Sequence, residues 1–120
     1  MPRGNPMSKS RVLKRRHLIY YLEVYDLESG NLLGHLVDIT TRGIKLISKE
    51  KIPLNRTYVL KLKLPQGYFQ ESEIHFEGKT LWSSNDVNPD FFDTGLEVTS
   101  LSLEERKILR QLIEQLGFND

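Results

Sequence analysis

The stretch Asp38-Ile39-Thr40-Thr41-Arg42-Gly43 lies between two segments with the composition of β-strands, residues 32–37 and 44–48. It places an acid, two hydroxyls, a cation and a glycine where a hairpin turn needs only two or three residues. A carboxylate accepts hydrogen bonds from a ring N–H and an amine, hydroxyls donate or accept, and glycine allows close backbone approach. The same residues are also ordinary in a β-turn with a bulge. On this evidence alone the corner is either a recognition site or a simple turn.

Outward from this corner, the chain alternates β-rich segments with turn residues. On its N-terminal side, residues 18–25 are rich in β-branched and aromatic side chains, and residues 26–31 have turn composition, so a hairpin is predicted. Gly34 is expected to mark a bulge in the second strand. On the C-terminal side, we expect a polar loop at residues 83–90 and strands at the following positions: 44–48, 57–64, 68–76, 78–82 and 92–98.

The last segment changes from a strand pattern to a helix pattern. Ser102 with Glu105 three residues later forms a capping box, and Gly117 is a stop signal, so a helix is predicted over residues 102–116. Its apolar residues recur on one face. Six or seven short strands followed by one amphipathic helix predict an all-β domain with a C-terminal helix. The expected architecture is a small antiparallel β-barrel closed by that helix.

Length and composition limit the possible classes of protein. A chain of 120 residues fits one domain with a modest core. Residues 1–10 contain prolines, glycine and small polar side chains, and we expect a flexible leader there, followed by a single domain over residues 11–120. The chain has no cysteine, no secretory signal pattern and no apolar run long enough to span a membrane. We therefore expect a cytoplasmic protein without membrane insertion.

Charge is distributed unevenly along the chain. Residues 1–17 carry six basic side chains and no acidic one, while the remaining residues carry 11 basic and 16 acidic side chains. A basic leader on a mildly acidic body indicates that the leader meets an anion, although a basic tail that only aids solubility has the same composition.

No pattern indicates catalysis or metal binding. The three histidines, His17, His35 and His75, do not have metal-ligand spacing, and no serine lies in a nucleophile-elbow sequence. Glycine-rich phosphate loops are absent. We expect no enzymatic activity, no metal site, Asp93 and Glu97 as solvated surface acids, and Trp82 as a core residue.

The order of these features resembles the PilZ domain family. A basic segment is followed by a hairpin, D-x-T-x-x-G, further strands, G-x-x-x-W at residues 78–82, F-x-x-G-L at residues 92–96 and a final helix. The resemblance covers residues 11–116. It implies a PilZ-like, split-barrel fold and a bacterial receptor for the second messenger cyclic di-GMP. In that family an R-x-x-x-R segment and a D/N-x-S/T-x-x-G corner bind this nucleotide.

The resemblance also implies which residues of this chain bind the ligand. The set consists of three arginines ahead of the barrel and three corner residues: Arg11, Arg15, Arg16, Asp38, Thr40 and Gly43. Arg11 and Arg15 satisfy R-x-x-x-R, but a count back from the first strand puts Arg15 or Arg16 in the first position, so both arginine registers stay open. Guanidinium groups bind phosphate and guanine O6 and N7. Asp38 and Thr40 are expected to read guanine, and Gly43 to permit the corner.

The implied function is signalling by binding. The leader is expected to order over the ligand, and this change is expected to be read by a protein partner in motility, exopolysaccharide or related signalling. No cofactor besides the ligand is expected. Two other interpretations remain: a PilZ-like adaptor that no longer binds nucleotide, and a small barrel that binds RNA or single-stranded DNA through its basic arm. The acidic body makes nucleic acid the less favoured partner.

Overall fold

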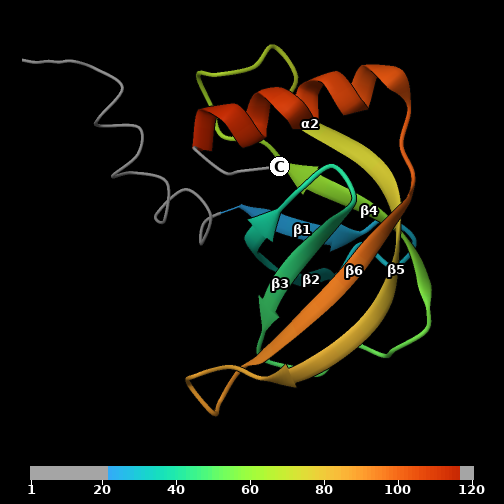
Figure 1. Ribbon diagram of the computed structural model, residues 1–120, viewed down its shortest axis with the longest axis vertical. Helices are drawn as coiled ribbons and strands as arrows, with labels where there is room; N and C mark the ends of the chain where they lie inside the picture. Colours follow the sequence, from blue (N-terminus) through green and yellow to red (C-terminus); the bar gives the residue numbers. More distant parts are fainter. Residues whose placement is uncertain (1–21, 117–120) are drawn as a thin grey trace, which may run out of the picture.

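The computed structural model describes residues 22–116, which form a closed barrel with one helix (Figure 1). The elements in chain order are β1 Glu23–Asp26, β2 Leu32–Ile39, β3 Gly43–Ser48, β4 Thr57–Lys63, β5 Glu73–Asn85, β6 Phe92–Ser100 and α2 Leu103–Leu116. Around the barrel the order is β1-β2-β3-β6-β5-β4, and every neighbouring pair is antiparallel. This confirms the predicted antiparallel barrel with a C-terminal helix.

The strand count differs from the sequence prediction at one place. Residues 68–76 and 78–82 were expected as two strands, but Glu73–Asn85 is one strand of 13 residues and residues 68–72 belong to the preceding turn. Gly78 was expected as the first residue of a new strand. It instead lies inside β5, where a Cβ would come within 3.0 Å of Leu60 Cδ1, so glycine fits a crowded position next to a bulge. The same strand also takes in residues 83–85, which were expected in the loop.

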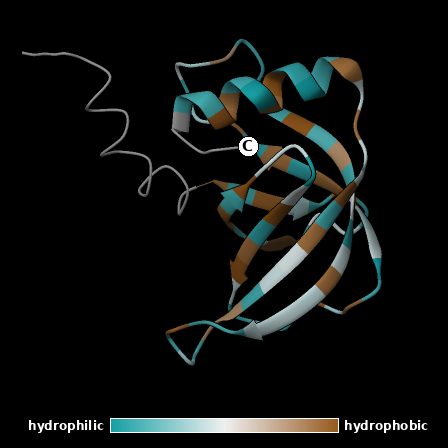
Figure 2. Cartoon of the chain, viewed as in Figure 1, coloured by the Kyte–Doolittle hydropathy of each residue, from teal (hydrophilic) through white to brown (hydrophobic). Residues whose placement is uncertain are grey.

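Alternation of apolar and polar residues builds the core. In β4, Leu60 and Leu62 are fully buried while Lys61 and Lys63 remain half-exposed, as the sequence predicted. Hydrophobic and hydrophilic residues alternate along the strands (Figure 2), and the buried apolar residues form one core cluster. Each fully buried leucine contributes about 1.5–3 kcal/mol relative to an exposed one. The barrel interior is therefore filled with side chains.

The hairpin between β1 and β2 has the predicted turn and bulge. Asp26 accepts hydrogen bonds from the Glu28 backbone N–H at 3.0 Å and the Ser29 hydroxyl at 3.0 Å, and Gly30 has a φ of 78°. The register then shifts beside Gly34, where a Cβ would meet the Ile47 carbonyl oxygen at 2.6 Å. The close approach of β3 requires glycine at this position.

Helix α2 lies across one end of the barrel (Figure 1). Ser102 caps it, because its Oγ accepts from the Glu105 backbone N–H at 3.1 Å and donates to Glu105 Oε1 at 2.9 Å. Glu105 Oε2 also accepts from the His75 backbone N–H at 3.0 Å, which ties the helix start to β5. The buried face of the helix closes the core with four residues: Ile108, Leu109, Leu112 and Ile113.

Several sequence predictions concern residues outside the described range. These are the flexible leader at residues 1–10, most of the first strand at residues 18–21, and the helix stop at Gly117. Within residues 22–116, no helix has both the length and the apolar character needed to cross a membrane.

Candidate functional site

The corner between β2 and β3 is held by the side chain of Thr40. Its Oγ1 accepts hydrogen bonds from the backbone N–H groups of Arg42 and Gly43, each at 3.1 Å. The same hydroxyl donates to the Gly43 carbonyl oxygen at 3.4 Å. The Thr40 backbone N–H donates to the same carbonyl at 2.9 Å. A hydroxyl has one hydrogen to donate and two lone pairs, so Thr40 is fully engaged in shaping the corner.

Asp38 stands at the end of β2 with its side chain exposed. Its Oδ1 accepts from the Ile39 backbone N–H at 2.9 Å, which fixes the orientation of the carboxylate. Oδ2 has no hydrogen-bond partner among residues 22–116. One oxygen therefore anchors the side chain while the other remains available to a ligand.

Gly43 is required by the neighbouring strand. A Cβ at this position would lie 2.8 Å from the Leu96 carbonyl oxygen of β6, where Gly43 pairs with Glu97. The sequence predicted that glycine allows close backbone approach, and the structure identifies β6 as the backbone that approaches. This contact fixes the corner against the sheet.

Four neighbouring strands each place one residue in a row across the outer surface of the barrel. Asp38 on β2 is opposite Lys45 on β3. Lys45 is opposite Gly95 on β6, which is itself opposite Trp82 on β5. The residues on either side of Lys45 are buried, so its own side chain points outward. We call the surface around these four residues the site wall.

Trp82 was expected in the core, and this prediction was wrong. The register between β5 and β6 shifts between Thr80 and Trp82, so Thr80 is buried while Leu81 and Trp82 are 49% and 44% exposed. The indole ring lies on Gly95, where a Cβ would overlap its atoms. A bulge changes which face a side chain occupies, and its position cannot be read from alternation alone. The glycine of F-x-x-G-L was the available signal, because it leaves room for a large neighbour.

The site wall carries a shallow pocket of about 280 Å³. Its lining includes three corner residues, Lys45 and two exposed apolar side chains of β5: Asp38, Thr40, Gly43, Lys45, Leu81 and Trp82. A larger hollow of about 620 Å³ lies between the start of β2 and the end of β3, but it contains no corner residue. We take the smaller pocket as the candidate site because the three predicted corner residues meet in it. Lys45 was not predicted as a site residue. It lies two residues after Gly43 in β3, and because side chains alternate between the two faces of a strand, it shares the outer face with Gly43.

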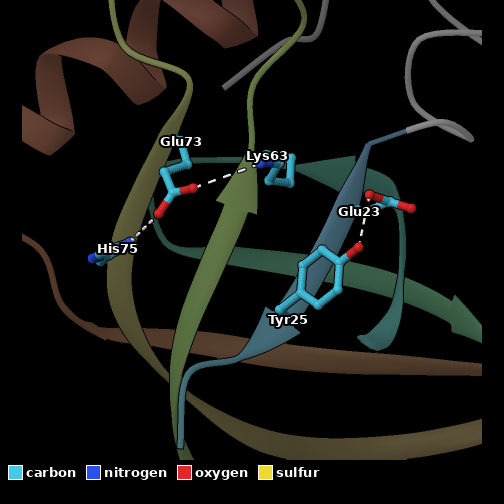
Figure 3. A network of polar contacts seen from close by, with 5 residues as sticks. All are labelled: Glu23, Tyr25, Lys63, Glu73 and His75. Carbon is cyan, nitrogen blue, oxygen red and sulfur yellow. Dashed lines mark hydrogen bonds and ion pairs between the residues drawn. The ribbon is translucent and has the colours of Figure 1, made fainter. Parts of the chain in front are cut away.

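The charged residues across the barrel are paired with one another (Figure 3). On β1 the Tyr25 hydroxyl donates to Glu23 Oε1 at 2.9 Å, and this hydrogen bond raises the pKa of Tyr25. Glu73 on β5 lies 2.7 Å from His75 Nε2 and 3.7 Å from Lys63 Nζ, and the hydrogen bond with His75 is the main cause that lowers the pKa of Glu73. We call the surface around these five residues the paired wall.

Asp93 was predicted as a solvated surface acid, but it is only partly exposed and its Oδ1 is buried without a hydrogen-bond partner. Burial is the main cause that raises its pKa, the neighbouring Asp86 carboxyl raises it further, and the charge of Lys45 lowers it. Asp93 therefore belongs to the site wall and interacts with Lys45 at longer range than an ion pair.

The three predicted arginines, Arg11, Arg15 and Arg16, lie outside the described residues. The described chain begins at Leu22, whose carbonyl accepts a hydrogen bond from the Leu36 backbone N–H at 2.9 Å. Leu36 precedes Asp38 by two residues on the same strand. The arginine segment is thus joined to the barrel beside the strand that carries Asp38.

Residues 22–116 contain no cluster of three or more histidine, cysteine, aspartate or glutamate side chains that could hold a metal ion. What the described site presents is a carboxylate oxygen, an ammonium group and an aromatic surface within one open pocket. These groups bind a ligand that has hydrogen-bonding edges and a flat face.

The barrel, its closing helix and this open pocket define a small β-barrel domain with a pocket on its outer surface. A protein-family model for the PilZ domain matches residues 14–115, and the chain belongs to this family. No curated protein matches the chain.

Solved structures share the fold at low sequence identity. The Bacillus subtilis inhibitor of motility MotI/DgrA is 19% identical, with a TM-score of 0.65 over 82% of this chain and 48% of that protein. The PilZ domain of Escherichia coli YcgR with c-di-GMP is 14% identical, with a TM-score of 0.62 over 81% of each chain. Borreliella burgdorferi PlzA in complex with c-di-GMP is 21% identical, with a TM-score of 0.54 over 95% of this chain and 51% of PlzA. The chain therefore spans about half the length of MotI and PlzA.

Proposed function

We propose that this chain is a receptor domain for cyclic di-GMP and that the ligand binds on the site wall. The observation that carries the proposal is the row from Asp38 through Lys45 and Gly95 to Trp82, because it unites a free carboxylate oxygen with an exposed aromatic ring in one pocket. Structural neighbours named as c-di-GMP complexes, YcgR and PlzA, support the choice of ligand.

Each described residue has a distinct role in this proposal. Asp38 accepts hydrogen bonds from guanine N1–H and the exocyclic amine, which lie on the Watson–Crick edge. Trp82 supplies a stacking surface for a purine. Thr40 and Gly43 act chiefly by holding the corner in shape, Thr40 through its three hydrogen bonds and Gly43 through its contact with β6.

The leader completes the proposed site. In this proposal, the guanidinium groups of Arg11 and Arg15 bind phosphate and guanine. Arg16 assists them or takes the place of one of them. Arg16 lies six residues before Leu22, and an extended chain of that length spans up to about 20 Å. Ordering the leader over the ligand has an entropic cost that lowers affinity but produces a conformational signal.

The signal is proposed to act on a protein partner in the bacterial cytoplasm. Neighbours named as an inhibitor of motility and as a transcription regulatory factor are consistent with regulatory outputs of this fold. Binding rather than catalysis is proposed to be the whole activity of the domain.

The test is calorimetric titration of the full chain with cyclic di-GMP at moderate salt, with GTP and a short RNA as control ligands. We expect low-micromolar or tighter binding of cyclic di-GMP that is lost in Asp38→Ala. Asp90→Ala is the matched control, because Asp90 is an exposed loop acid outside the pocket. Thermal unfolding of both variants checks that the fold is kept.

Two other results overturn the proposal. Absence of heat at high ligand concentration means that the fold is kept without its ligand, and the search then turns to protein partners. RNA binding that weakens steeply with salt and does not depend on Asp38 identifies a nucleic-acid-binding barrel.

A further inference from the structure

Lys45 occupies the centre of the site wall. It lies directly opposite Asp38 on one side and Gly95 on the other, and it lines the same pocket as Trp82. Cross-strand neighbours on one face have Cβ atoms about 4.5–5.5 Å apart, so the Lys45 and Asp38 side chains leave the sheet next to each other. The Asp38 carboxylate and the Lys45 ammonium nevertheless form no salt bridge in the described part of the chain, so the two groups lie farther apart than an ion pair.

The Lys45 ammonium has no hydrogen bond, ion pair or ring contact among the described residues. Two other strand lysines differ in this respect: Lys63 pairs with Glu73 at 3.7 Å, and Lys61 lies 4.7 Å from the centroid of the Tyr25 ring. An ammonium group has three donors. Because the Asp93 carboxylate acts on Lys45 only at longer range than an ion pair, these donors are free for a ligand. A ligand acceptor beside Asp38 would therefore meet a donor that is already in place.

Guanine presents such an acceptor in the right position. Along its Watson–Crick edge the exocyclic amine and N1–H are donors and O6 is an acceptor, and N7 on the adjoining edge is another acceptor. An acid next to a cation matches this order, since the acid accepts from the amine and N1–H while the cation donates to O6; N7 is an acceptor in adenine as well and does not distinguish the bases. Adenine presents a donor, N6, where guanine presents O6, and so places a donor against the cation.

We propose that Lys45 specifies guanine in this pocket by donating to O6 of the base that stacks on Trp82 and meets Asp38. The inference rests on the proposed function, because it names a base-reading residue within the same site. It adds a cation that belongs to the barrel itself, independent of the arginines of the leader.

A contact between Lys45 and phosphate is the competing explanation, and it has different consequences. Phosphate is common to cyclic di-GMP and cyclic di-AMP, so loss of a phosphate contact weakens both ligands equally and reduces the salt dependence of binding. Loss of a base contact weakens the guanine ligand alone, by about tenfold for a good donor–acceptor contact.

The experiment titrates full-length wild type, Lys45→Met and Lys45→Arg with cyclic di-GMP and cyclic di-AMP at two salt concentrations. We expect Lys45→Met to lose about tenfold in affinity for cyclic di-GMP and to keep its affinity for cyclic di-AMP, so that the preference falls. Lys45→Arg should restore the preference, because arginine also donates to O6 and N7. Lys61→Met, a strand lysine outside the pocket, should behave as wild type.

The outcomes separate the inference from the function beneath it. If wild type does not bind cyclic di-GMP, the proposed function itself fails. If wild type binds and Lys45→Met keeps the preference for guanine, or loses both ligands equally, the function stands and Lys45 does not read the base.

Discussion

The site wall and the paired wall are both charged outer faces of the same barrel, but their charges are arranged differently. On the paired wall, Glu73 lies within reach of both Lys63 and His75, and Tyr25 donates to Glu23 (Figure 3). On the site wall, Asp38 and Lys45 face each other across two strands without forming an ion pair. The charged side chains of the paired wall thus have partners within reach, whereas Asp38 and Lys45 do not pair with each other beside the exposed Trp82 ring. This difference marks the site more clearly than pocket size, since the larger hollow lacks the corner.

The largest effect on affinity for cyclic di-GMP is expected from removing the leader arginines that are proposed to complete the site. Each charge-assisted hydrogen bond contributes about 1.5–3 kcal/mol, so Arg11→Ala combined with Arg15→Ala should weaken cyclic di-GMP binding by about a hundredfold or more. The combination of Arg15→Ala with Arg16→Ala tests the other register. Calorimetric titration of both double variants identifies the pair that matters. Equal and small losses in both would show that the barrel binds the ligand without the leader.

The next effect is expected at the aromatic end of the row. Trp82→Ala removes a stacking surface worth about 1–3 kcal/mol per base, so affinity for cyclic di-GMP should fall about ten- to hundredfold. Because Trp82 is 44% exposed, the melting temperature should change little. Tyr68→Ala is the control, as Tyr68 is an exposed aromatic residue outside the pocket. Full affinity in Trp82→Ala would show that the ligand does not use the site wall as proposed.

The same tryptophan shows where sequence-based prediction of this fold ends. The barrel, the hairpin turn at residues 26–31 and the capped helix follow from local patterns, namely alternation in β4, the Asp26 turn and the Ser102 cap. The corner residues were predicted as site residues from their match to D-x-T-x-x-G, and Asp38, Thr40 and Gly43 line one pocket. Trp82 was misplaced because one extra residue in a bulge moves a side chain to the other face, and a bulge depends on pairing with a distant strand.

Lys45 was missed for a related reason. In the sequence it is one of many lysines in alternating strands. Its distinctive property is its place between Asp38 and Gly95, which depends on the register between β2, β3 and β6 and becomes visible only when the strands are paired. Local sequence thus predicts which elements form, whereas the contacts between elements decide which side chains share the site.

A smaller effect, a gain in stability, is expected from substituting Asp93 on the site wall. Its folded-state pKa is raised above the usual 3.8, chiefly by burial, so the folded protein favours the protonated form and loses stability as pH rises through that pKa. Asp93→Asn should therefore raise the melting temperature at neutral pH by a few degrees, and the gain should vanish in acid below the unfolded pKa. Thermal unfolding followed by circular dichroism across pH measures this, with Asp90→Asn as control. A lower melting temperature at neutral pH would mean that the carboxylate is needed as an acceptor.

The smallest effect is expected on the paired wall. The pKa of Glu73 is lowered from the usual 4.5, chiefly by its hydrogen bond with His75, so its contribution to stability is present above pH 4.5 and is lost as pH falls through the lowered value. Solvent screens these exposed groups, so Glu73→Gln should lower the melting temperature by a degree or less at neutral pH and low salt, and not at all at high salt.

Glu71→Gln, a change at an exposed acid nearby, is the matched control for Glu73→Gln. Both variants should bind cyclic di-GMP as wild type does, because neither residue lines the pocket on the site wall. A change in ligand affinity in Glu73→Gln alone would contradict the separation of the two walls. Since β5 carries Glu73 near its start and Trp82 near its end, that result would identify this strand as the element that couples them.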